Sequence, residues 1–186
     1  MDTLETERLV LRKFYLCDVD DVYKYASNPK VGPNAGWEPH RNKEDTLAII
    51  LEFIRSKEVW AIVHKESNKV IGSIGLHRDG KRALKNAKMI GYVLAEEYWG
   101  YGYATEAARR VIKYGFEELG LDLITVYHYP HNVRSKRVIE KCGFKYEGIL
   151  KNATVLYNGK VYDELCYSLT KEEYFKEIRG TNSMKR

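Results

Sequence analysis

The sequence has 186 residues, 44% of them hydrophobic and 31% charged, a balance typical of one globular domain rather than a disordered or membrane-spanning chain. No apolar run approaches the roughly 20 residues of a membrane helix, and the first residues lack the regions of a signal peptide. The net charge of +5 is modest, the basic residues are not concentrated in one strong patch, and no aromatic RNA-binding motif appears, so a nucleic-acid-binding role is not indicated. We expect one cytoplasmic domain over residues 1–178 and a flexible polar tail over residues 179–186.

The three cysteines, Cys17, Cys142 and Cys166, lack the paired spacing that zinc sites use. A sparse, odd set of cysteines is typical of free thiols in a reducing compartment. We therefore expect each of them to be a small core residue rather than a zinc ligand.

The first part of the chain predicts one strand and two helices. The strand covers residues 9–14, and a helix follows Asp18, its expected N-cap. The apolar face of this helix consists of Val19, Val22, Tyr23 and Ala26. Proline and glycine interrupt the pattern over residues 29–36, and a second helix begins after its expected cap, Asn42. The residues that this helix should bury are Leu47, Ile50, Leu51 and Ile54.

The middle of the chain predicts strands at residues 59–63 and 70–76, joined by a hairpin turn, and a third strand at residues 89–94. A glycine-rich turn then leads into a long amphipathic helix that ends near Gly120, a typical C-terminal cap residue. The apolar face of this helix consists of Ala104, Ala107, Ala108, Val111, Ile112, Phe116 and Leu119.

The last part predicts a strand at residues 123–128, a helix after Asn132, and antiparallel strands at residues 144–150, 153–157 and 161–169. Asn158-Gly159 is a strong hairpin signal, because both central positions of such a turn need positive φ. The order of elements predicts an α/β (α+β) fold, with a central mixed, mostly antiparallel sheet of about seven strands and helices on both faces.

The segment Trp99-Gly100-Tyr101-Gly102-Tyr103-Ala104 joins a strand to a helix. Free N–H groups and the dipole at a helix start attract anions, and glycine lets the backbone approach a phosphate closely. Thr105 stands where a dinucleotide fingerprint would have a third glycine, and no Gly-Lys-Ser/Thr of a P-loop is present. Taken alone, the segment is compatible with an anion site or with an ordinary tight turn.

A second segment, Asn132-Val133-Arg134-Ser135 followed by Glu140-Lys141-Cys142-Gly143-Phe144, supplies the context. Together the two segments resemble the GNAT superfamily of acetyl-CoA-dependent N-acetyltransferases: the first resembles its pyrophosphate motif, and the second its Asn-x-x-Ser/Ala…Glu-Lys-x-Gly-Phe segment. The resemblance covers nearly the whole chain, because the order of elements is also that of the family. Within the superfamily the chain looks like the branch that includes ribosomal-protein N-terminal (alanine) acetyltransferases.

The resemblance implies that acetyl-CoA is the co-substrate and that the backbone of the glycine-rich turn binds its pyrophosphate. One strand would pair with the pantetheine amides, and Asn132 would lie near the thiol end. Arg134, Lys136 or Arg137 could contact the phosphates, although a solvated helix face also explains each of them. The implied cofactor-binding residues are Tyr92, Val93, Leu94, Trp99, Gly100, Tyr101, Gly102, Tyr103, Ala104, Thr105, Asn132, Ser135 and Arg137.

Two positions depart from the family pattern. Many members have a tyrosine, the general acid for the thiolate, where this chain has Ile139. The hydroxyl of Ser135 could donate instead, or it could simply bond a nearby carbonyl within its helix. Related enzymes often have a glutamate base where Met89 stands. Our candidate base is His128, although a lone histidine at a strand end is more often a surface or packed residue than a base; more distant candidates are His77, Glu97 and His131.

The loop Gly36–His40 lies where the superfamily usually builds its acceptor pocket. We expect Trp37 and His40 to contact the acceptor, with Tyr92 below them, although ordinary packing also explains Trp37. A site without a strong base favours an α-amine, with a pKa of about 7.7–8.0, over a lysine amine near about 10.4.

We therefore expect direct transfer of an acetyl group from acetyl-CoA to a primary amine, which could be a small molecule or a protein N-terminus. The resemblance implies no metal, and we expect no nucleic-acid or membrane partner and a monomer or homodimer. Two alternatives stay open. One is an acyl-CoA sensor without transfer activity, and the other is an N-acetyltransferase for a small molecule such as a polyamine or an antibiotic.

Overall fold

Eight strands pair edge to edge in the order β1-β2-β3-β4-β5-β6-β8-β7 in the computed structural model, which describes residues 1–183. The strands are β1 (Leu4–Glu5), β2 (Leu9–Arg12), β3 (Val59–His64), β4 (Lys69–Arg78), β5 (Ala87–Leu94), β6 (Leu123–His128), β7 (Lys145–Val155) and β8 (Val161–Thr170). All neighbours are antiparallel except β5 and β6, which are parallel. The predicted mixed, mostly antiparallel sheet is confirmed, and the sequence analysis missed β1.

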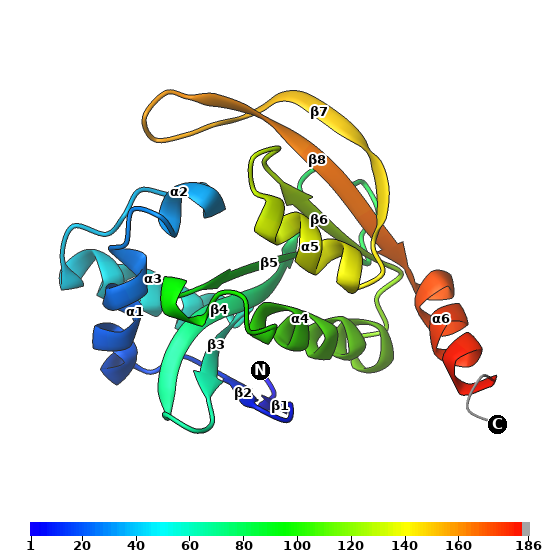
Figure 1. Ribbon diagram of the computed structural model, residues 1–186, viewed down its shortest axis with the longest axis horizontal. Helices are drawn as coiled ribbons and strands as arrows, with labels where there is room; N and C mark the ends of the chain where they lie inside the picture. The colour runs from blue at the N-terminus through cyan, green and yellow to red at the C-terminus, as the bar shows by residue number, and fades with distance from the viewer. Residues whose placement is uncertain (184–186) are drawn as a thin grey trace.

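The longer helices are α1 (Val19–Ala26), α3 (Lys43–Ser56), α4 (Tyr103–Lys113), α5 (Val133–Lys141) and α6 (Lys171–Ser183). Between them lie the short helices η1 (Leu16–Asp18), α2 (Gly32–Ala35), η2 (Glu96–Tyr98) and the π-helical turn η3 (Tyr114–Glu118). In Figure 1, α4 and α5 lie in front of the sheet, while the hairpin of β7 and β8 arches from α6 toward α2. No helix within residues 1–183 is long and apolar enough to cross a bilayer.

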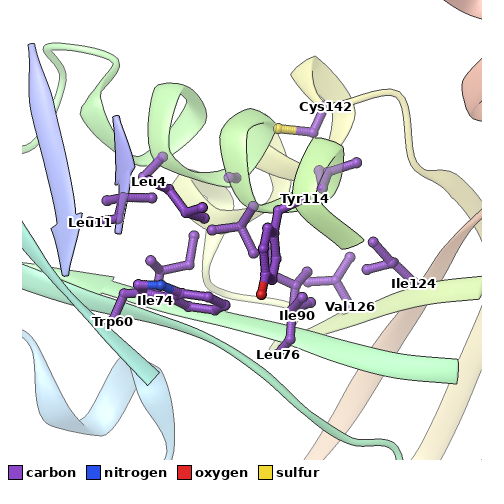
Figure 2. Close-up of a cluster of buried hydrophobic side chains, with 14 of the residues drawn as sticks. Leu4, Leu11, Trp60, Ile74, Leu76, Ile90, Tyr114, Ile124, Val126 and Cys142 are labelled. Atoms are coloured by element: carbon purple, nitrogen blue, oxygen red, sulfur yellow. The ribbon is translucent and has the colours of Figure 1, made fainter. Parts of the chain in front are cut away.

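Two apolar cores cover the two faces of the sheet. The larger core lies under α4 and α5, and Figure 2 shows Leu4, Ile74 and Ile90 filling the space between α4 and the sheet. The ring of Tyr114 meets the ring of Trp60 edge to face, with 5.6 Å between centroids. The second core joins β3 and β4 to α1 and α3. Helices on both faces therefore hold the sheet rigidly around the site described below.

Of the two N-caps predicted for the first helices, one is present and one is not. The Asn42 side chain caps α3 by accepting from the N–H of Asp45 at 2.8 Å, as predicted. Asp18 stands at the predicted start of α1, but its carboxylate does not cap that helix. It accepts instead from the guanidinium of Arg12 and from the N–H of Tyr15. The guanidinium of Arg12 donates two hydrogen bonds to this carboxylate. Such a charged bidentate pair is stronger than the single hydrogen bond of a helix cap.

The buried face of α3 is narrower than predicted. Of the four apolar residues expected to be buried, only Ile50 is in the core, whereas Leu51 is 47% exposed and Ile54 is 36% exposed. The helix rests on α1 and β3 at one side of the domain, so only a narrow stripe of it meets other elements. In α4, the predicted apolar face is buried at its centre, but Leu119, beyond the π-helical turn, is 46% exposed.

The C-terminal part holds two further corrections. Of the Asn158-Gly159 pair, only Gly159 has a positive φ, of 78°. The N–H of Gly159 bonds the carbonyl of Leu156, which makes the loop wider than a two-residue hairpin. Helix α6 was not predicted and contains residues 179–183 of the expected tail; residues 184–186 lie outside the described chain.

All three cysteines are free thiols. Cys142 and Cys166 are buried in the domain as expected, but the prediction of a core position is wrong for Cys17, which is exposed. Cys17 lies in η1, whose other apolar residue, Leu16, is also 53% exposed. This short helix lies at the surface and buries neither side chain.

Candidate active site

The site begins where two strands separate. The parallel strands β5 and β6 pair only from Ala87 to Met89 on β5. Beyond Met89 the facing backbone of β5, as far as Leu94, has no strand partner on that side, although it stays paired with β4 on the other. A cleft of about 740 Å³ occupies this opening. Unpaired N–H and C=O groups along a strand can bind the amides of an extended ligand chain.

The glycine-rich turn closes one end of this cleft. Gly100 and Gly102 have φ values of 87° and 85°, which other residues rarely adopt. The turn leads directly into α4, so the free N–H groups of its first turn face the cleft, as an anion site requires. The predicted turn residues that line the cleft are Trp99, Gly100, Gly102, Tyr103, Ala104 and Thr105. Tyr101 is 65% exposed and does not line it.

An ion pair braces the turn from behind. The carboxylate of Glu106, in the first turn of α4, accepts from the Thr6 hydroxyl at 2.6 Å and from the backbone and side chain of Arg8. The Arg8 guanidinium also donates to the Tyr101 carbonyl at 3.1 Å and lies over the Tyr103 ring. Burial alone would raise the pKa of Glu106, but these hydrogen bonds lower it overall. The loop between β1 and β2 therefore holds the turn in place.

Asn132 joins both sides of the cleft. Its side-chain oxygen accepts from the N–H of Ser135 at 3.1 Å and so caps α5. Its side-chain amide donates to the carbonyl of Asn34 in α2 at 3.2 Å. The asparagine expected near the thiol end of the ligand lines the cleft, and it also ties the start of α5 to the opposite wall.

Two hydroxyl groups meet between the strand and α5. The hydroxyl of Tyr92 lies 3.0 Å from the hydroxyl of Ser135 and 3.2 Å from its carbonyl oxygen. Burial raises the pKa of Tyr92, which keeps the phenol protonated at neutral pH. Both side chains line the cleft, so this pair can pass a proton to a group that lies beside it.

Three basic residues on one face of α5 point into the cleft: Arg134, Arg137 and Lys141. Their i, i+3, i+7 spacing aligns them along the helix. The Arg134 guanidinium lies over the Trp99 ring, 4.6 Å from its centroid. Lys136 does not line the cleft and pairs with Glu140 at 3.7 Å. The sequence analysis missed Lys141.

Comparison with known protein families identifies the domain that contains this glycine turn, these split strands and this basic helix face. The family model described as an acetyltransferase (GNAT) domain matches residues 8–145. The chain belongs to the GNAT family. It is similar to the uncharacterized N-acetyltransferase YoaA of Bacillus subtilis, with 32% identity over 173 residues that cover 90% of this chain and 96% of the relative. The chain is an acetyl-CoA-dependent N-acetyltransferase.

Two further comparisons agree. The crystal structure of a GNAT-family acetyltransferase from Bacillus anthracis has a TM-score of 0.84 and 31% identity, covering 92% of this chain and all of that one. YdaF of B. subtilis, which is named, provisionally, as a ribosomal N-acetyltransferase, is 36% identical over 103 residues and 55% of each chain. The GNAT domain thus has acetyl-CoA as its co-substrate, and the residues above fit such a ligand.

The GNAT domain departs from its family at two positions. Ile139 is 1% exposed, packs into the larger core and has no proton to donate. Met89 lines the cleft without a titratable group. Both departures make the surrounding hydroxyl and imidazole groups the candidates for proton transfer.

His128 lies on the face of β6 that carries the larger core. Its Nδ1 donates to the carbonyl of Tyr129 at 2.8 Å, since a carbonyl can only accept. Its Nε2 is buried without a partner within the described residues, and its ring packs near Tyr167. Burial lowers the pKa of His128. The imidazole is therefore a neutral acceptor beside α5, and its catalytic role stays a prediction.

The wall of the cleft opposite α5 is called the acceptor side below, because the acceptor is expected there. Trp37, an expected acceptor contact, lines the cleft, whereas His40 does not: its Nδ1 bonds the Thr46 hydroxyl at 2.9 Å and its ring packs against Trp37. His40 therefore supports Trp37 from outside. Glu97, a more distant candidate base, instead pairs with Lys24 at 2.5 Å and does not line the cleft.

Four residues of the acceptor side were not predicted from the sequence: Lys81, Tyr127, Tyr129 and Glu164. The Lys81 ammonium pairs with the buried carboxylate of Glu164 and lies 4.0 Å from the centre of the Tyr127 ring. The alternation of β6 places Tyr127 on the side away from His128, and Tyr129 follows the end of the strand. That alternation was visible in the sequence, but nothing there indicated that the β8 residue Glu164 would meet Lys81.

Proposed function

We propose that the GNAT domain acetylates an α-amino group, that of a peptide or protein N-terminus. The observation that carries this proposal is the charge of the cleft. Glu164 is the only acidic side chain that lines it within residues 1–183, and Glu164 is already paired with Lys81 and bonded by Thr154. A polyamine or an aminoglycoside antibiotic carries several ammonium groups and needs several free carboxylates. An acceptor with a single amine does not.

The rest of the acceptor side supports the same acceptor class. Trp37, Tyr127 and Tyr129 present aromatic rings to the cleft, and such rings give a peptide large contact area. The relative YdaF, with its provisional ribosomal name, is consistent with an acceptor on a protein. A monomer or homodimer in the cytoplasm fits this role.

The proposed reaction is direct transfer. Acetyl-CoA supplies a thioester whose carbonyl carbon accepts the amine. The free amine attacks this carbon, a C–N bond forms, the C–S bond breaks, and the thiolate takes up a proton. A negative charge develops on the carbonyl oxygen during attack. We assign its stabilisation to a backbone N–H of β5 near Val93 and Leu94, where the strand has no partner on the cleft side. Ser135, bonded to Tyr92, would donate the proton to the thiolate.

The glycine turn and the basic face of α5 would hold the phosphates. Helix α4 offers free N–H groups next to Gly100 and Gly102, and Arg134, Arg137 and Lys141 offer positive charge. Holding both substrates in line can supply about 7–11 kcal/mol of the barrier in favourable cases. Positioning is therefore the largest proposed contribution of this chain.

An acceptor panel tests the proposal. We would measure thiol release with a peptide that has a free N-terminus, the same peptide with a blocked N-terminus and one free lysine, spermidine, and an aminoglycoside. The free N-terminus should react fastest. Faster acetylation of spermidine or of the aminoglycoside would contradict the assignment of the acceptor.

A further inference from the structure

Met89 stands where related enzymes often have a glutamate base, and a histidine lies beside it on the neighbouring strand. His77 on β4 is the register partner of Met89 on β5. Directly paired residues of antiparallel strands project from the same face of a sheet. The imidazole of His77 is therefore on the face where the Met89 side chain lies, one strand away, and both side chains line the cleft.

Two glycines make room for this imidazole. A Cβ atom built at Gly75 would lie 2.7 Å from the Nε2 of His77, which no real side chain could tolerate without a shift. A Cβ atom at Gly91 would lie 3.7 Å from the same nitrogen. Gly75 and Gly91 are themselves register partners, and Gly91 lies two residues beyond the last pairing between β5 and β6. The Nε2 atom thus lies on the floor of the cleft where the strands separate.

Two charged groups face His77. Its Nδ1 lies 3.9 Å from a carboxylate oxygen of Glu58, just before β3, and the ammonium of Lys88 on β5 donates to the other oxygen of Glu58 at 2.8 Å. Burial lowers the pKa of His77, Glu58 acts in the opposite direction, and Lys88 lowers it further. The imidazole is therefore neutral at pH 7, with its Nδ1 side toward Glu58 and its Nε2 toward the cleft.

We propose that His77 is the general base that takes the proton from the acceptor ammonium, directly or through one water, in place of a carboxylate at Met89. This inference rests on the proposed function. The proton passes from the ammonium to Nε2 and then to solvent, and the neutral amine attacks the thioester. The second proton of the amine goes to the departing thiolate. His128 also lines the cleft, but it projects from the opposite face of the sheet, beside α5.

The test compares pH profiles of wild-type protein and His77→Gln with an N-terminal peptide as acceptor. In the wild type, kcat should fall in acid below the ordinary histidine pKa of 6.5, because the pKa of His77 is lowered. In His77→Gln, kcat at pH 7 should fall by roughly 10²-fold. The midpoint of the rise of kcat with pH in this variant should shift toward the pKa of the acceptor amine itself, about 8. Unchanged binding of acetyl-CoA and unchanged thermal unfolding show that the variant is folded.

A rescue of the lost rate by a second substitution distinguishes a catalytic base from a histidine with only a structural role. The double variant H77Q/M89E would restore a base on the same face, and it should recover part of the lost rate at pH 7. The matched control H77Q/L84E adds the same charge at a loop residue that is 50% exposed and outside the cleft, and it should recover none.

The inference is wrong if wild-type protein transfers acetyl groups but His77→Gln keeps the wild-type profile, or if His128→Gln moves the profile instead. Wild-type protein that transfers no acetyl group to any amine contradicts the proposed function itself and, with it, this inference.

Discussion

The hydroxyl of Tyr92 on β5 lies 3.0 Å from the hydroxyl of Ser135 on α5. This contact joins a residue of the split strand to the helix that follows Asn132. It brings two proton-bearing groups together about one helical turn before Ile139, whose side chain is buried in the core.

Ser135→Ala should lower kcat by roughly 10²-fold, because general acid catalysis typically contributes at least that much. The KM for acetyl-CoA should change less, since the hydroxyl acts mainly as the C–S bond breaks. Steady-state kinetics gives both constants. Ser56→Ala is the matched control, because that hydroxyl bonds only a carbonyl of its own helix. A full wild-type kcat in Ser135→Ala would rule out this proton donor.

Gly102→Ala should raise the KM for acetyl-CoA by roughly tenfold, since a left-handed φ costs other residues about 1–2 kcal/mol. The φ of Gly102 is 85°, and a Cβ atom there would lie 3.6 Å from Arg8, without a clash. The effect would therefore come from backbone strain in the turn. Gly80→Ala is the control, because a Cβ atom there meets nothing within 4 Å. Equal KM values in the two variants would contradict a role for this turn.

Arg137→Ala should raise the KM for acetyl-CoA by roughly tenfold at low ionic strength, and high salt should reduce the difference. Arg137 lines the cleft, whereas Lys136, its neighbour in sequence, pairs with Glu140 outside it. Lys136→Ala removes the same charge and should leave KM nearly unchanged. The assignment of the phosphate-binding face fails if the two variants behave alike.

Glu106→Gln should destabilise the protein by roughly 1–2 kcal/mol, after allowing for solvent around the half-exposed Arg8. Because the pKa of Glu106 is lowered from 4.5 in the folded protein, this contribution is complete above pH 4.5. It is lost as the pH falls through the lowered value. Thermal unfolding at pH 7 should show a midpoint roughly 2–8 °C lower, and the difference should shrink in acid.

The control for that measurement is Glu5→Gln, which removes an exposed pair with Lys65 and should change the midpoint little. A midpoint difference for Glu106→Gln that stays constant down to the acid limit would show that the carboxylate charge is not what braces the turn.

Local signals allowed much of the fold to be predicted. The Asn42 cap and the Asn132 cap each bond a neighbour three residues away, and the positive φ values of the turn fall on its own glycines. The start of α6 was missed although it has a local signal of the same kind: Thr170 and Glu173 bond each other's backbone N–H groups as a capping box. Packing of Tyr174 against Phe116 then holds that helix to the domain.

The parts of the site that could not be predicted depend on strand register. The sequence contains His77 and Met89, but nothing in it states that they face each other across β4 and β5. Lys81, in the loop after β4, meets Glu164 on β8, 83 residues further along the chain, only through the tertiary fold. Pattern reasoning places a side chain on a face, whereas the pairing of strands decides which side chains share a position on that face.

Acetyl transfer to an N-terminal amine can be measured directly with acetyl-CoA that carries a label on its acetyl group and a peptide that has a free N-terminus. Thiol release and label in the peptide would be measured in the same reaction. Transfer predicts one labelled amide for each thiol released, at a rate that saturates in both substrates. Tight binding of acetyl-CoA with no thiol release above the rate without protein would contradict this account and indicate a sensor instead.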